Sequence, residues 1–177
     1  MKVIFESARL LFREFTEEDA PLILELNKHS AVVQYVHENP ITNLAAALVN
    51  ITERILPQYQ QYGYGRWAVE TKDSKTFIGW CGLKYRPERD EIDLGYRFIP
   101  GFWGKGYATE AALASLRFGF ENLKLPVIHA MAHIENTASL RVLEKCNMQF
   151  LGFEEVETCP VKTFFRQNPA GSSLQNH

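Results

Sequence analysis

Residues 103–110 read Trp-Gly-Lys-Gly-Tyr-Ala-Thr-Glu, between a predicted strand and a predicted helix, and they constrain the fold more than any other segment. Gly104 and Gly106 lie one residue apart, so the backbone can turn sharply and expose consecutive N–H groups. Where such a turn opens a helix, these donors add to the positive end of the helix dipole and form a site for an anion such as phosphate. The pair needs this context, because Gly63 and Gly65 form another Gly-x-Gly in a predicted loop.

The composition describes an ordinary globular domain and excludes several classes of function. A chain of 177 residues, 46% hydrophobic and 23% charged, is long enough to bury a core. A net charge of −2 and a pI near 6.2 give no electrostatic basis for binding nucleic acid or an anionic membrane. No segment resembles a signal peptide or a bilayer-spanning helix, so we expect a cytoplasmic protein. The cysteines, Cys81, Cys146 and Cys159, form no Cys-x-x-Cys pair and predict reduced, buried thiols and no metal site.

Hydrophobic periodicity and turn residues predict the order of strands and helices. The predicted strands cover residues 9–15, 65–71, 76–85, 91–99, 127–135, 150–157 and 163–165. The predicted helices cover residues 16–33, 44–59, 107–122 and 136–146. Pro57 is expected to end or bend the second helix, and Asn147 to supply the left-handed residue that ends the last one.

This order is mixed α/β, with two helices after the first strand and then three antiparallel strands. It is not the alternating pattern of a Rossmann fold, and the third glycine of the dinucleotide fingerprint would fall at Thr109. The Gly-Lys-Ser/Thr sequence of a P-loop is also absent. We expect one domain at residues 1–166 and a flexible tail at residues 167–177.

Four short motifs occur along the chain: Arg9-Leu10-x-x-Arg13, Asp93-Leu94-Gly95-Tyr96, the segment 103–111, and Asn136-x-x-Ser139-x-Arg141-Val-Leu-Glu-Lys145. In this order they resemble the GNAT superfamily of acetyl-CoA-dependent N-acetyltransferases, and most of all its Rim-type branch of ribosomal-protein N-terminal acetyltransferases. The resemblance extends from Arg9 to about Phe165. It implies a mostly antiparallel, twisted sheet that splays between its fourth and fifth strands and is flanked by about four helices.

The resemblance also implies where acetyl-CoA binds. In this family the turn holds the pyrophosphate through backbone N–H groups, and the corresponding residues are Trp103, Gly104, Lys105, Gly106, Tyr107, Ala108 and Thr109. The pantetheine arm lies between the splayed strands and pairs with free backbone, which we expect at Arg97, Phe98 and Ile99. Asn136, Ser139 and Lys145 complete the predicted coenzyme contacts, and Asn136 is equally suited to capping the helix that it begins.

Acetyl transfer requires a neutral amine, and an α-amine with a pKa near 8 is mostly protonated at pH 7. Asp93 corresponds to a carboxylate that many relatives carry, and strand alternation places Glu91 on the same face, so either can be the general base. Many relatives protonate the leaving thiolate with a tyrosine, but Leu143 stands at that position. Ser139 remains the hydroxyl for this task, as in the Rim-type branch. Nothing in the sequence supports a nucleophile that pairs His133 with a cysteine.

We therefore expect an enzyme that transfers acetyl from acetyl-CoA to a primary amine, in the first place the N-terminal α-amine of a protein or peptide. Two alternatives stay open: a small-molecule amine such as an antibiotic or a metabolite, or a non-catalytic module that binds acyl-CoA. An enclosed acidic acceptor pocket would favour polyamines, and an open groove would favour peptides. The partners expected are acetyl-CoA and the amine acceptor, with no nucleic acid and no membrane. Relatives often pair through strand edges, which predicts a homodimer.

Overall fold

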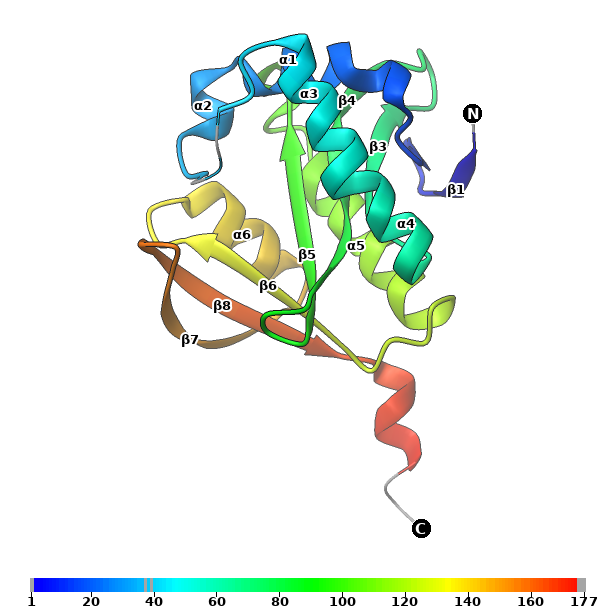
Figure 1. Cartoon of the computed structure of the whole chain (residues 1–177). Helices are drawn as coiled ribbons and strands as arrows, with labels where there is room; N and C mark the ends of the chain where they lie inside the picture. The colour runs from blue at the N-terminus through cyan, green and yellow to red at the C-terminus, as the bar shows by residue number, and fades with distance from the viewer. Residues whose placement is uncertain (1, 37, 39, 175–177) are drawn as a thin grey trace.

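The computed structural model describes residues 2–174 except His37 and Asn39, and this part of the chain forms one sheet flanked by helices (Figure 1). The strand order is β1-β2-β3-β4-β5-β6-β8-β7. The strands are β1 (Val3–Glu6), β2 (Leu10–Arg13), β3 (Arg66–Thr71), β4 (Phe77–Arg86), β5 (Glu91–Phe98), β6 (Val127–His133), β7 (Gln149–Val156) and β8 (Cys159–Gln167). The helices are α1 (Ala20–Asn27), α2 (Ser30–Val33), α3 (Leu44–Asn50), α4 (Leu56–Tyr62), α5 (Tyr107–Glu121) and α6 (Thr137–Lys145).

The middle of the sheet has the predicted antiparallel strands and the predicted splay. β3, β4 and β5 pair antiparallel, with Gly82 opposite Gly95 and Lys84 opposite Asp93. β5 and β6 run parallel, and they pair only where Asp93 and Leu94 meet β6. Beyond Leu94 the two strands diverge, as Figure 1 shows for the green β5 and the yellow β6. The backbone of β5 therefore has no neighbouring strand on this side as it approaches the glycine turn.

Each face of the sheet is covered by its own hydrophobic cluster. α5 packs on one face through small residues, and a Cβ added at Gly119 would lie 2.8 Å from Cδ1 of Ile128, so this helix needs glycine for its close approach. The other face is covered by α1 and α3, whose buried side chains pack with Phe15, Ala68 and Phe77. Figure 1 shows α3 and α4 running diagonally across this face. The splayed strands therefore lie between two packed layers.

The helices that precede β3 differ from the predicted ones because of long-range contacts. The predicted helix at residues 16–33 is interrupted at His29, whose backbone is extended with a ψ of 113°, shortly after Asn27, which accepts from Arg97 on β5 at 2.5 Å. The predicted helix at residues 44–59 continues past Pro57, because a π-helical turn (Ile51–Ile55) joins α3 to α4 and accommodates the proline. The chain leaves α4 at Gly63, which has a φ of +77°.

The two ends of the described chain contain structure that the sequence did not predict. β1 pairs with β2 at one sheet edge. β8 extends to Gln167 and a short helix follows at Pro169–Leu174, in the segment where the sequence predicted a tail without regular structure. The left-handed residue expected after α6 is confirmed, with a φ of +55° at Asn147. None of the described helices has the length and apolar character that crossing a membrane requires.

Candidate active site

The glycine turn before α5 has the geometry of an anion site. Gly104 and Gly106 have φ angles of +71° and +80°, where any residue with a Cβ is strained. Gly106 is the N-cap of α5, and the first helical hydrogen bond runs from the Glu110 N–H to the Gly106 carbonyl at 3.0 Å. The N–H groups of residues 107–109 therefore have no acceptor within the helix and are directed out of its N-terminal end. This arrangement suits a phosphate group.

Arg9 holds this turn in place. Its guanidinium donates to the Lys105 carbonyl at 3.0 Å and to Glu110 Oε2 at 2.6 Å, and it lies 4.3 Å from the centre of the Tyr107 ring. Glu110 also accepts from the Arg9 backbone N–H at 2.8 Å and from the Ser7 hydroxyl at 2.7 Å. Burial by itself raises the pKa of Glu110, but these hydrogen bonds and the Arg9 charge outweigh it and lower the pKa. The sequence singled out Arg9 only as part of a motif, without a role.

The backbone of β5 faces the opening between the splayed strands at alternate residues. The Ile99 N–H donates to the Ile78 carbonyl of the β4 side at 2.8 Å, so the prediction that Ile99 offers its amide to a ligand is wrong. Because backbone groups alternate along a strand, those of Arg97 also face β4, whereas those of Tyr96 and Phe98 face the opening. The predicted pairing surface is therefore shifted by one residue.

The Trp103 side chain connects this strand to the turn. Its indole Nε1 donates to the Phe98 carbonyl at 2.8 Å, and about half of the residue is exposed. The indole therefore braces the end of β5 against the turn, and the Phe98 N–H stays free to face the opening. The sequence did not predict this contact, because the indole reaches the Phe98 carbonyl only when the chain turns at Pro100.

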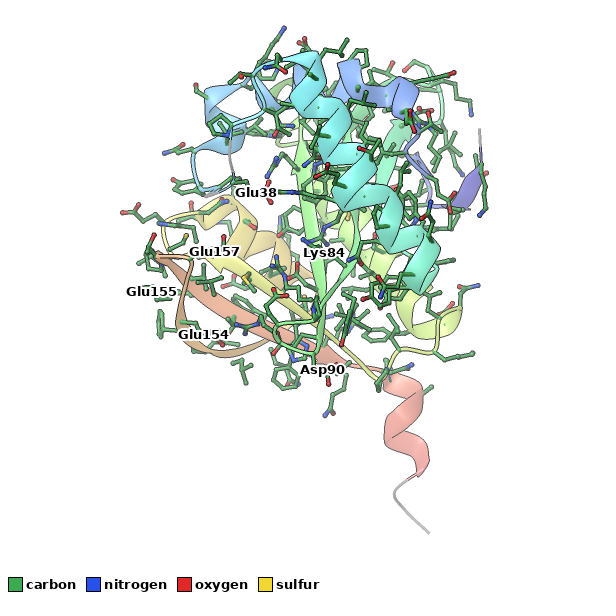
Figure 2. All side chains as sticks on the ribbon, in the orientation of Figure 1. Glu38, Lys84, Asp90, Glu154, Glu155 and Glu157 are labelled. Carbon is green, nitrogen blue, oxygen red and sulfur yellow. The ribbon has the colours of Figure 1, made fainter. Side chains whose placement is uncertain are left out.

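A cleft of about 1270 Å³ connects the turn, the splay and the surface. Its lining includes most of the predicted site residues: Asp93, Arg97, Phe98, Trp103, Gly104, Gly106, Tyr107, Ala108, Thr109, Asn136, Ser139 and Lys145. Glu91, Ile99 and Lys105 were predicted for the site but do not line the cleft. Side chains from distant segments complete the lining, and Figure 2 labels three of them, Glu38, Lys84 and Glu157.

Asp93 is buried in the cleft and is bonded to guanidinium groups. Arg66 Nη2 donates to Asp93 Oδ2 at 2.7 Å, and Arg86 Nε lies 3.3 Å from the same oxygen. The other carboxylate oxygen, Oδ1, is buried and has no hydrogen-bond partner among the described residues. Arg66 reaches Asp93 across Gly95, where an added Cβ would lie 2.5 Å from Nη2. The glycine in the Asp-Leu-Gly-Tyr motif thus makes room for Arg66, and Asp93 keeps one oxygen free.

Glu91, the other predicted base, lies away from the cleft. Alternation does place it on the same sheet face as Asp93, but two residues back along β5, which is about 7 Å. Its carboxylate accepts from Arg89 Nε at 2.8 Å, and Arg89 also binds Glu154 of β7. Of the two predicted bases, only Asp93 lines the cleft, and the geometry therefore favours Asp93 over Glu91.

Two hydroxyl groups meet across the splay. The Tyr96 hydroxyl of β5 donates to the Ser139 carbonyl at 2.9 Å and lies 3.0 Å from the Ser139 hydroxyl. Burial raises the pKa of Tyr96, so the phenol keeps its proton. Asn136 orients this turn of α6, since its side-chain oxygen accepts from the Ser139 N–H at 3.1 Å, which confirms its capping role. Leu143 stands where many relatives have a tyrosine, and here Tyr96 brings a phenol to Ser139 from the opposite strand instead.

The histidine and cysteines do not form a nucleophile. His133 lines the cleft, stacks on Tyr35 at 5.0 Å and accepts the Glu135 N–H at Nδ1, which places the proton of the neutral ring on Nε2. Cys81 and Cys146 are buried, and burial raises their pKa values to about 12 and about 11. Within residues 2–174, apart from the two undescribed positions, no group of three or more His, Cys, Asp or Glu side chains could hold a metal ion.

Comparisons with known proteins identify the family of this chain. The profile of the family described as "Acetyltransferase (GNAT) domain" matches residues 9–149. The uncharacterized N-acetyltransferase YnaD of Bacillus subtilis (strain 168) is 34% identical over 147 residues, which is 82% of this chain and 82% of that protein. The crystal structure of a GNAT-family acetyltransferase from Bacillus anthracis is 26% identical, with a TM-score of 0.77 over 95% of this chain and 99% of that chain.

A more distant structure shares the fold. RimL, a ribosomal L7/L12 alpha-N-protein acetyltransferase, has a TM-score of 0.80 over 96% of this chain and 99% of its own, at 17% identity. The mixed α/β architecture and the splayed sheet predicted from the sequence are those of this fold. The chain belongs to the GNAT family and is an acetyl-CoA-dependent N-acetyltransferase.

Proposed function

We propose that this enzyme acetylates the N-terminal α-amine of a protein or peptide, as in the Rim-type branch. The observation that carries the proposal is the charge of the cleft floor, the sheet residues Arg66, Lys84, Arg86, Asp93 and Arg97. These are four cations and one carboxylate. A floor of this kind repels a polycation such as a polyamine and disfavours any protonated amine. An α-amine, with a pKa near 8 instead of about 10.4, is the amine that most readily enters in its neutral form.

The size of the cleft supports a peptide acceptor. Its 1270 Å³ exceeds the range of roughly 300–1,000 Å³ of most small-ligand pockets. Part of this space is needed by the coenzyme arm between β5 and β6. The remaining walls come from α2, α4 and the turn between β7 and β8, so an extended chain segment can leave the cleft between separate elements.

Fold likeness alone does not select the acceptor. RimL and the spermidine N-acetyltransferase SpeG of Vibrio cholerae both share this fold, the latter as a mutant structure with a TM-score of 0.69 at 21% identity over 94% of this chain and 96% of that chain. The cleft floor favours the acceptor class of the first over that of the second, because its guanidinium and ammonium groups oppose a polyamine.

In the proposed reaction the residues of the cleft have separate tasks. The N–H groups at the start of α5 bind the pyrophosphate of acetyl-CoA, and the Tyr96 and Phe98 backbone pairs with its pantetheine arm. Asp93 Oδ1 accepts the proton of the amine as the amine attacks the thioester carbon. Ser139 donates a hydrogen bond to the departing sulfur, and a thiol with a pKa of about 8.5 leaves without a stronger acid.

Thiol release from acetyl-CoA with a panel of acceptors tests the proposal. We expect turnover with short peptides that have a free N-terminus, with the acetyl group located on the α-amine by fragment mass spectrometry. N-terminally blocked peptides that contain lysine are the matched control and are expected to be poor acceptors. Faster turnover of spermidine or an aminoglycoside would replace the proposal by a small-amine acetyltransferase. Binding of coenzyme A with no acceptor turned over would indicate a binding module.

A further inference from the structure

We propose that Lys84 binds a carboxylate of the acceptor, so that the preferred acceptor carries an acidic side chain on its second residue. This inference rests on the proposed function and names the substrate class more narrowly. It assigns to Lys84 the selection of the acceptor and not a step of acetyl transfer.

Lys84 is the cation of the cleft floor that has no fixed partner. Its side chain lines the cleft and is only partly exposed, and Figure 2 labels it on β4. Among the described residues, no carboxylate lies within ion-pair distance of its Nζ and no hydrogen bond involves it. Burial, followed by the charges of Arg66 and Arg86, lowers the pKa of Lys84. A partly buried ammonium group without a counter-ion is unfavourable, and a carboxylate of a bound ligand can supply that counter-ion.

The other cations of the floor are already bonded. Arg66 donates to Asp93 Oδ2 at 2.7 Å, and Arg86 Nε forms an ion pair with the same oxygen at 3.3 Å without a hydrogen bond. Arg97 donates to Asn27 Oδ1 at 2.5 Å and lies 3.7 Å from Glu38. Lys84 is therefore the cation of the floor that is available to form an ion pair with the substrate.

The carboxylates around the rim do not replace such a counter-ion. Glu38, Glu53, Glu88, Glu135 and Glu157 line the cleft from helices and loops, and all five residues are exposed. Exposed charges are well solvated and screened, whereas those of the floor are partly removed from water. The field deep in the cleft is therefore set by the sheet residues, where cations predominate.

The position of Lys84 fixes where the anionic group lies on the acceptor. Lys84 is directly opposite Asp93 across β4 and β5, and the Cβ atoms of such a pair lie about 5 Å apart. In the proposed reaction the amine gives its proton to Asp93, so a group that binds Lys84 belongs to the same residue or to the next one of the acceptor. In a peptide bound through its α-amine, the side chain of the second residue meets this condition.

Paired acceptors and paired variants test this inference. The acceptors are the peptide amides Ala-Glu-Ala and Ala-Gln-Ala, which differ by one charge, together with free glutamate and spermidine. The variants are Lys84→Gln, Lys84→Arg and, as a matched control, Lys28→Gln, which removes an exposed lysine at the end of α1. For each pair kcat/KM is measured by thiol release, and coenzyme A affinity by calorimetry.

We expect wild type and Lys28→Gln to prefer Ala-Glu-Ala by about tenfold in kcat/KM, the scale of one charge-assisted hydrogen bond. Lys84→Gln is expected to lose this preference through its KM for the acidic peptide, with a much smaller change in kcat/KM for Ala-Gln-Ala, while its coenzyme affinity stays at the wild-type level. Lys84→Arg is expected to retain the preference. A merely structural lysine would affect both peptides equally.

The outcomes separate this inference from the proposed function. Equal rates for the two peptides in wild type, a preference that survives in Lys84→Gln, or a faster reaction with spermidine would overturn the role of Lys84. Turnover of glutamate but of neither peptide, with the dependence on Lys84, would refute the peptide acceptor and support the carboxylate site. Coenzyme binding without turnover of any acceptor would overturn both.

Discussion

At the scale of the residue, the proposed chemistry depends on the free oxygen of Asp93, because Arg66 and Arg86 occupy the other one. Asp93→Asn keeps the shape of the side chain but cannot take a proton, so we expect kcat to fall by roughly 10²-fold. Coenzyme A affinity is expected to stay nearly unchanged. The residual rate of the variant is expected to rise with pH toward the pKa of the acceptor, about 8 for an α-amine. Steady-state rates over a series of pH values measure this.

Glu91→Gln is the control for this experiment, since it removes a carboxylate from the same strand face. It is expected to retain wild-type activity, because Glu91 binds Arg89 outside the cleft. Full activity of Asp93→Asn with an unchanged pH profile would show that Asp93 is not the base. In that case the cationic floor would be sufficient to keep the amine neutral, and no general base would be needed.

Tyr96 and Ser139 form a second pair whose members are expected to act together. Ser139→Ala is expected to lower kcat by about tenfold, which corresponds to one hydrogen bond of about 1.4 kcal/mol. Tyr96→Phe removes the phenol that orients the serine, and we expect a loss of similar size. The double variant is then expected to be no slower than the poorer single variant. Losses that multiply in the double variant would mean that the two hydroxyl groups act independently.

The residues that the sequence predicted correctly for the cleft belong to local motifs. Residue type and position were sufficient to predict the backbone roles of Gly104, Gly106 and Asn136, because turns and helix caps depend on a few neighbouring residues. Arg66 and Lys84 carry no such signal, since their roles depend on strand register: Arg66 reaches Asp93, 27 residues further along the chain. A sequence pattern identifies a carboxylate, but only the folded sheet shows which cations surround it.

At the scale of the element, the turn and the start of α5 are expected to bind coenzyme A as one rigid unit. Gly106→Val places a β-branched residue at a φ of +80°, and backbone strain of about 1–3 kcal/mol is expected to displace the N–H groups and weaken binding by at least about tenfold. Gly101→Ala is the matched control, because the space around Gly101 is open and its φ is not positive. Calorimetry compares the two variants. Equal affinities would contradict the phosphate site.

The lowered pKa of Glu110 predicts how the stability of the folded protein changes in acid. Its pKa is lowered in the folded protein from 4.5, so protonation favours the unfolded chain. The stabilisation by Glu110 is thus complete above pH 4.5 and disappears as the pH falls through the lowered value. Glu110→Gln is expected to reduce the free energy of unfolding by about 1–2 kcal/mol near neutral pH and by less in acid. Denaturant unfolding at several pH values measures the difference. A deficit independent of pH would show that the charge is not involved.

Elements with strong periodicity were predicted well, and elements shaped by distant contacts were not. β3, β4, β5 and α5 lie within a few residues of their predicted bounds, because alternation and helical spacing decide them locally. The break between α1 and α2 follows Asn27, whose side chain is bonded to Arg97, 70 residues away. β1 is a short edge strand whose partner, β2, fixes it. Such features need the tertiary structure.

At the scale of the whole molecule, the β7 end of the sheet is an apolar surface that the described chain leaves uncovered. β7 is the last strand in the sheet order, and three of its apolar side chains are largely exposed: Phe150, Leu151 and Phe153. An edge strand with such residues is a site for pairing with another strand. The neighbouring Glu154 is bonded to Arg89, which reduces the repulsion that two copies of β7 would otherwise experience.

We therefore expect two copies to pair through β7 about a two-fold axis. Light scattering is expected to give twice the chain mass of 20.3 kDa. Phe153→Asp is expected to yield a folded monomer, because this residue is 70% exposed in the single chain and its replacement disturbs no core. Val49→Asp is the control, since Val49 is 49% exposed on α3, away from this edge, and the dimer is expected to persist. A wild-type mass of one chain at micromolar concentration would exclude the assembly, and a dimer that survives Phe153→Asp would place it at another surface.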